Sequence, residues 1–166
     1  MSLLEETLNK AVRDIIDSIL EVDGFSIKAK QNAPRPTSSY CTVDVISIKR
    51  MGLEEQILED QSDPELDINY TAYGHKEVMY SLQFYFQGAM DNALKVNIGL
   101  VRLTIGEILR TANLGLVTRS EVRDISEPFE NGWEERAQLD IVLSALGTDE
   151  DIIRSIQSIS ISVKRS

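Results

Sequence analysis

The chain has 166 residues, a formal net charge of −10 and a pI near 4.6. Hydrophobic residues make up 42 % and charged residues 27 %, which is the balance of an ordinary globular protein and excludes general disorder. Neutralising nucleic-acid phosphates takes clustered lysines and arginines, and no basic run exceeds two residues. The composition therefore argues against sequence-specific nucleic-acid binding.

The cysteine count and the apolar runs restrict the setting further. With Cys41 as the only cysteine, an internal disulfide is excluded, which fits a reducing compartment. The first residues lack the basic start and apolar middle of a signal peptide. No apolar stretch approaches the ~20 residues that a membrane span needs, so we expect no membrane partner.

The first predicted element is an amphipathic helix over about residues 3–22. Ser2 and Glu5 fit a capping box at its start, and Gly24 is well placed to end it. Apolar residues recur between them at helical spacing and form one stripe: Leu4, Leu8, Ala11, Val12, Ile15, Ile16 and Ile19.

A short strand is expected at residues 25–28, followed by the loop QNAPRPTSSY, in which two prolines forbid regular structure. Residues 40–50 are rich in β-branched residues and predict a strand that buries Cys41 as a structural thiol. Residues 52–76 are acidic and lack a sustained period. They predict a long loop or a protruding hairpin, inserted in a single domain that spans residues 1–166.

Residues 77–87 give the clearest strand, with alternating apolar positions from Val78 to Phe86 and Gly88 after its end. Residues 89–112 predict helix, and the cost of Gly99 and Gly106 predicts a break near Thr104. The expected core contacts of this segment are Ala89, Ala93, Val96, Leu100, Leu103, Ile108 and Leu109.

The rest of the chain predicts a strand at 116–125, a turn at 126–132, a strand at 133–145 and a final strand ending ISISVK. Residues 148–156 are ambiguous between helix and strand. In the 133–145 strand, the alternation places one set toward the core: Trp133, Ala137, Leu139, Ile141 and Leu143. It places another set toward solvent: Glu134, Arg136, Gln138, Asp140 and Ser144.

This order of elements predicts an α+β fold. We expect a largely antiparallel sheet, with the N-terminal helix and the central helical segment packed on one face.

No sequence motif indicates catalysis, a cofactor or a metal site. The chain lacks a phosphate-binding glycine pattern, a nucleophile elbow and a zincin helix. The single histidine, His75, has no ligand pair at a useful spacing, which favours a solvated side chain. We therefore expect no catalytic residues and no cofactor. An enzyme with an unfamiliar site would need a pocket that gathers carboxylates with Tyr70, Tyr73 or His75.

A few residues are candidates for subunit or partner contacts. Trp133 fits a core or sheet-edge position better than an interface anchor. Arg119, Glu121 and Arg123 alternate along one predicted strand face, as a solvated row or as cross-strand ion pairs between subunits. For Arg35, held between two prolines, an interface contact and an ordinary loop are equally open. The candidate set is Arg35, Arg119, Glu121, Arg123, Trp133 and Arg136.

Two stretches, QNAPRP at 31–36 and GWEERAQLDI at 132–141, carry a resemblance over nearly the full length of the chain. Together with the N-terminal helix, YSLQFYFQGAMDNAL and the isoleucine-rich end, they resemble the neck or tail terminator proteins of tailed bacteriophages and prophages. The resemblance implies an α+β structural virion protein without catalytic residues, assembled in the host bacterial cytoplasm.

The resemblance further implies a homo-oligomeric ring, usually of six subunits, which caps the tail tube and joins it to the head-side connector. DNA would pass through such a ring without specific binding, and an acidic lumen would repel its backbone. Two alternatives stay open. One is a head-completion or connector ring protein of the same neck, and the other is a non-viral intracellular adaptor domain.

Overall fold

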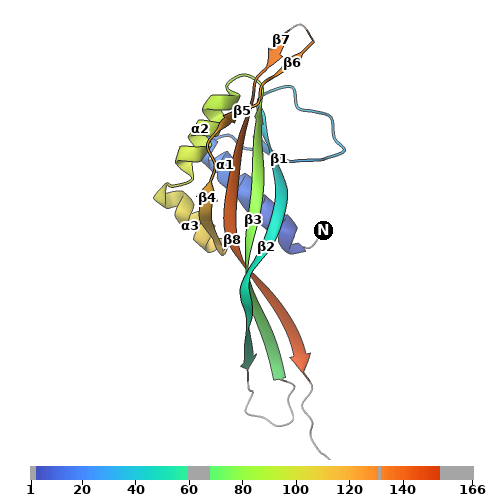
Figure 1. Cartoon of the computed structure of the whole chain (residues 1–166), viewed down its shortest axis with the longest axis vertical. Coiled ribbons are helices and arrows are strands. Elements are labelled where there is room, and N and C mark those ends of the chain that lie inside the picture. Colours follow the sequence, from blue (N-terminus) through green and yellow to red (C-terminus); the bar gives the residue numbers. More distant parts are fainter. Residues whose placement is uncertain (1–2, 60–67, 131, 154–166) are drawn as a thin grey trace, which may run out of the picture. The chain divides into compact units, whose positions relative to one another are not determined.

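Residues 3–59, 68–130 and 132–153, which the computed structural model describes, form three helices and eight strands (Figure 1). Contacts divide the chain into unit 1, residues 1–50 and 76–145, and unit 2, residues 51–75 and 146–166. The predictions for Ser2 and for the ISISVK strand lie outside the described residues. Of the stretch predicted as a loop or hairpin, residues 52–59 lie in β2 and residues 68–76 lie in β3.

The N-terminal helix α1, Leu3–Leu20, confirms the predicted amphipathic helix and buries Val12, Ile15, Ile16 and Ile19 of its apolar stripe in unit 1. It ends earlier than expected, because Glu21 already takes the left-handed conformation after the last turn, with φ 58°, three residues before Gly24, whose φ is 71°. The Asp17 carboxylate then accepts hydrogen bonds from the backbone of Gly24 at 2.9 Å and of Ser26 at 2.8 Å. These bonds hold the turn that leads into the first strand.

The main sheet follows the order β1-β2-β3-β8-β4, with β5 also paired to β8. The bounds are β1 Ser26–Lys28, β2 Tyr40–Glu59, β3 Ile68–Tyr85, β4 Leu114–Arg119, β5 Arg123–Asp124 and β8 Arg136–Ile153. Strands β4 and β5 run antiparallel to β8, whereas β1 runs parallel to β2. The α+β prediction is confirmed.

In unit 1 the core lies between one face of the sheet and the helices, which cover that face (Figure 1). Alternate residues of each strand point to the same face, so a period of two selects the buried set. That set is Cys41, Val43, Val78, Tyr80, Leu82, Phe84, Ala137, Leu139, Ile141 and Leu143. The burial of Cys41 is as predicted, and it raises the pKa of this thiol well above its ordinary value.

The predicted central helix is two helices, α2 Ala89–Gly99 and α3 Leu103–Thr111, broken close to the expected place. The break changes which residues of the second helix face the core. Ile105 and Leu109 are buried, one helical turn apart, whereas Leu103 is 89 % exposed and Ile108 is 40 % exposed. The predictions of Leu103 and Ile108 as core residues were therefore wrong, because the connection at 100–102 resets the helical phase.

Two predicted strands differ from the structure at their ends. Strand β3 stops at Tyr85, and Phe86 has a φ of 68°, so it does not continue the alternation. The predicted 116–125 strand is interrupted between β4 and β5, where the Ser120 amide donates to the Asp140 carbonyl at 2.8 Å and the Ser120 hydroxyl donates to the Glu121 carbonyl. The predicted 126–132 turn contains strand β6, Glu127–Phe129, which pairs with β7, Gly132–Glu134.

Candidate interface surfaces

Strands β6 and β7 form a separate two-stranded ribbon at one end of unit 1 (Figure 1). Its register places Glu127 opposite Glu134 and Pro128 opposite Trp133. Glu135 then interrupts the path into β8. Its carbonyl accepts a hydrogen bond from the Phe86 amide at 3.0 Å, and its carboxylate accepts one from the Gly88 amide at 2.8 Å.

The exposure of two side chains at the start of the strand differs from the prediction. Glu134 stays on the same face as Arg136, with which it forms an ion pair, but it also contacts Arg35 and is buried. Glu134, predicted to face solvent, is only 6 % exposed, whereas Trp133, predicted to face the core, is 74 % exposed. Both of these predictions were wrong, while the alternation from Ala137 to Leu143 was correct.

The buried Glu134 carboxylate forms ion pairs with both Arg35 and Arg136. Arg35 comes from the Pro-rich loop at residues 31–39, and its guanidinium also donates to the Tyr40 hydroxyl at 3.0 Å. Arg136 donates to Glu134 at 2.7 Å and pairs with Glu127 at 2.7 Å. One carboxylate therefore links the 31–39 loop to the ribbon and to the first residue of β8.

Aromatic rings lie beneath these arginines on the face of the sheet opposite the helices. Tyr40 and Tyr85 stack at 4.6 Å between ring centroids, with an interplanar angle of 9°. The Arg35 guanidinium lies 5.4 Å from the Tyr85 centroid and 4.8 Å from that of Phe86, and Arg136 lies 5.2 Å from that of Tyr85. Cation–π attraction adds to the ion pairs, which fixes the two guanidinium groups. We call Arg35, Tyr40, Tyr85, Phe86, Glu134 and Arg136 the arginine clamp.

The charged groups of the arginine clamp stabilise one another. The hydrogen bond from Arg35, followed by the interactions with Arg136, lowers the pKa of Glu134 below its ordinary value, against the opposing effect of burial. The same hydrogen bond with Glu134 raises the pKa of Arg35 further above its already high value. Burial raises the pKa of the Tyr85 hydroxyl. Glu134 is thus held as a carboxylate, which suits a structural clamp rather than a general acid.

The other three candidate residues lie around a groove of about 320 Å³ at the edge of the sheet. Arg119, Glu121 and Arg123 all line it, although they do not alternate along one strand. Arg119 donates to the Asn97 carbonyl, and Arg123 pairs with Asp140, which also accepts a hydrogen bond from Gln138 at 2.9 Å. Both arginines are therefore engaged within the subunit.

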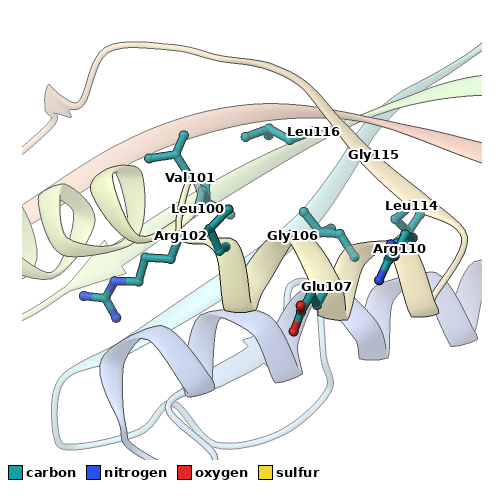
Figure 2. Close-up of a pocket in the computed structure, with 11 residues that line it drawn as sticks. Leu100, Val101, Arg102, Gly106, Glu107, Arg110, Leu114, Gly115 and Leu116 are labelled. Atoms are coloured by element: carbon teal, nitrogen blue, oxygen red, sulfur yellow. The ribbon is translucent and has the colours of Figure 1, made fainter.

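A larger groove, of about 550 Å³, opens between α3 and the edge strand β4 (Figure 2). Leu100, Val101 and Arg102 of the α2–α3 connection form one end, and Leu114, Gly115 and Leu116 of β4 form one wall. Leu103, Glu107 and Arg110 contribute from α3. We call it the Leu103 groove.

The sequence named Arg35, Trp133 and Arg136 among its candidate interface residues, and the structure brings them to the same end of unit 1. It missed Glu134, which holds the arginine clamp together, and the Leu103 groove. The sequence carried one signal for each feature. For Glu134 it is a glutamate beside Trp133 ahead of a strand, and for the groove it is the pair Gly99 and Gly106 within one helical segment. Neither signal predicts a partner without knowledge of the tertiary contacts.

Within the described part of the chain, no group of three or more His, Cys, Asp or Glu side chains is placed to hold a metal ion. The described helices also include none that is long and apolar enough to span a membrane. His75 is exposed in β3 and Tyr73 is partly buried, whereas the side chain of Tyr70 lies outside the description.

The family model described as phage neck terminator protein matches residues 6–166, which is nearly the whole chain. No curated protein matches the chain. The family match confirms the resemblance seen in QNAPRP and GWEERAQLDI.

Proposed function

Because the chain belongs to the phage neck terminator family, we propose that it assembles into a ring, of six subunits, that caps the tail tube. The family is one of structural neck proteins, not of enzymes, and membership indicates a component of the virion neck. In the proposed role the ring stops tube growth and joins the tube to the head-side connector. The single observation that carries the proposal is the family match over residues 6–166.

The surfaces of unit 1 support a role in assembly. Large apolar side chains are exposed on the ribbon and along α2 and α3, which is typical of surfaces that other protein copies cover. The charges of the arginine clamp pair within the subunit, so the clamp fixes the base of the ribbon. Packing between subunits accounts for the exposed apolar side chains.

The charge of the chain agrees with a ring through which DNA passes. Six copies would carry a formal charge of about −60, six times −10, and a field of this sign repels the phosphate backbone. DNA would then slide without specific binding. We further propose that assembly takes place in the host cytoplasm, before the head and tail join.

The test is the mass of the purified protein by light scattering over a concentration series, followed by electron microscopy with tail tubes. A six-subunit ring, free or at one end of the tube, is the expected result. Rings that bind isolated heads but not tubes would move the assignment to a head-completion or connector ring. A stable dimer without affinity for tubes would favour an adaptor domain and overturn the proposal.

A further inference from the structure

The ribbon of β6 and β7 presents an aromatic projection to solvent. Trp133 is 74 % exposed, and its cross-strand partner Pro128 lies on the same face of the ribbon. The arginine clamp holds the base of the ribbon through Glu134 and Glu127, so the projection starts from a fixed support. We call Pro128 and Trp133 the Trp133 knob. An exposed indole on a fixed support has the properties of an interface anchor.

The Leu103 groove is a recess on the same unit with exposed apolar side chains in its lining. Its walls carry Leu103, 89 % exposed, and Val101, 60 % exposed, where neighbouring helical residues also reach solvent. The exposed apolar residues along α2, the connection and α3 are Met90, Leu94, Ile98, Val101, Leu103 and Ile108. Single exposed apolar residues are ordinary, but two of these six, Val101 and Leu103, line a groove of about 550 Å³, which indicates a surface that another protein covers.

Charge agrees with this pairing. Three exposed glutamates, Glu127, Glu130 and Glu135, lie on or beside the ribbon. The groove has Arg102 and Arg110 at its margin, with a single acidic residue, Glu107, between them. An acidic ribbon and a margin with net positive charge attract each other, which favours one orientation of docking.

The two surfaces lie at different places on the same unit, because the ribbon extends from one end of unit 1 and α3 lies well away from it (Figure 1). We propose that the Trp133 knob of one copy docks into the Leu103 groove of the next copy. Such a contact is heterologous, and heterologous contacts repeat head to tail into rings or filaments. The inference deepens the proposed ring by naming the surfaces that would join its neighbours.

The surface area that Trp133 would bury in the groove indicates how strong one contact is. A buried Trp removes about 150–250 Å² from solvent, roughly a quarter of the ~800 Å² that each partner buries in a standard interface. The knob is thus an anchor that needs surrounding contacts. A single knob-in-groove contact is weak, and closure of a ring strengthens assembly because every copy then makes two contacts.

Cross-linking between two single-site variants tests the contact directly. Glu130→Cys places a thiol beside the knob, and Glu107→Cys places one in the groove, while both leave Trp133 and Leu103 in place. The native Cys41 is fully buried and does not compete for the reagent. The two variants are mixed and treated with a short bismaleimide, and the products are separated by mass.

The expected result is a cross-linked dimer that contains one copy of each variant, in excess over the two homodimers. Adding Trp133→Ala to the Glu130→Cys chain should abolish the mixed dimer, whereas adding Val22→Ala, also at an exposed apolar residue, should leave it unchanged. Homodimers in excess, or a mixed dimer that survives Trp133→Ala, would overturn the contact.

The same experiment separates this inference from the proposed function. If rings form on tail tubes but the cross-link between positions 107 and 130 is absent, the proposed ring function is supported and the knob-in-groove contact is refuted. A mixed dimer from protein that neither forms rings nor binds tubes would support the contact and refute the terminator role. The absence of any mixed dimer, at every concentration at which the protein stays soluble, overturns the contact whatever the oligomeric state.

Discussion

Arg35 and Glu134 are 99 positions apart in the sequence and form an ion pair in which the Glu134 side chain is buried. The pair joins the Pro-rich 31–39 loop to the ribbon that carries Trp133. Arg136 shares the same carboxylate, so two cations face one anion above the stacked rings of Tyr40 and Tyr85. This arrangement makes Glu134 the residue on which the local structure depends most.

Glu134→Gln should destabilise the protein by about 1–3 kcal/mol, because two guanidinium groups lose a charged acceptor that is buried between them. This loss of unfolding free energy is smaller than the loss on breaking a fully buried ion pair, since the Arg35 side chain is 39 % exposed. Urea denaturation measures the change. Glu130→Gln, at an exposed position of the same ribbon, is the matched control, with an expected change within about 0.5 kcal/mol. Equal effects of the two variants would refute the clamp.

Acid should remove the stabilisation that the ionised Glu134 side chain gives to the folded protein. Its pKa in the folded protein lies below the ordinary value of 4.5. The stabilisation is therefore fully present above pH 4.5 and is lost as the pH falls through the folded-state pKa. The difference in unfolding free energy between the wild type and Glu134→Gln should therefore be constant near neutral pH and narrow below 4.5. Comparing the two proteins at each pH cancels the other carboxylates. A gap that stays constant into strong acid would contradict this assignment.

Cys41 should be unreactive in the native protein. Its side chain is 0 % exposed, and burial raises the pKa of the thiol, so neither access nor thiolate is available at neutral pH. Ellman's reagent should report no thiol before denaturant is added and one thiol per chain afterwards. The Glu130→Cys variant should show one fast thiol before denaturant. Rapid reaction of the wild type would mean that the β2 region opens readily.

Gly99→Ala should destabilise the protein, because an added Cβ would collide with the Ile19 side chain where α2 packs on α1. Overpacking of this kind costs about 1–3 kcal/mol, which exceeds the helix-propensity gain of about 1 kcal/mol. Gly106→Ala in α3 is the matched control, since a Cβ there meets no heavy atom within 4 Å. That control should be neutral or stabilising in thermal denaturation. Stabilisation by both substitutions would show that α1 and α2 are not packed as described.

The fluorescence of Trp133, the only tryptophan, should report assembly. At low concentration the exposed indole should emit at long wavelength and be quenched by iodide. As copies associate, the emission should shift to shorter wavelength and quenching should fall, because the groove removes the indole from water. Leu103→Glu should keep the dilute spectrum at every concentration. An unchanged spectrum in a wild-type sample that has demonstrably assembled would exclude Trp133 from the contact.

Periodicity predicted the parts of the fold in which a regular element covers one core face. The α1 stripe and the alternation from Val78 to Phe84 survive because each is a continuous run with one period. Failures occurred where contacts or connections outside the regular element decide exposure. Arg35 and Arg136 bury Glu134, the β6–β7 ribbon leaves Trp133 in solvent, and the 100–102 connection turns Leu103 outward.

The candidate surfaces were harder to predict for a different reason. The burial of Glu134 depends on Arg35, which is far away in sequence, and local patterns carry no information about such a contact. The Leu103 groove combines residues of α3, the α2–α3 connection and an edge strand, so it exists only once these elements have packed. The family resemblance supplied the class of protein, but not the contacts that form either surface.

The separation of Arg35 and Glu134 also bears on the order of folding. A contact that closes so long a stretch of chain costs much conformational entropy, so we expect it to form after β2 and β3 have brought Tyr40 beside Tyr85. The arginine clamp would then slow unfolding without hastening folding. In a virion that waits long between assembly and infection, the lifetime of the native state would depend on this late contact.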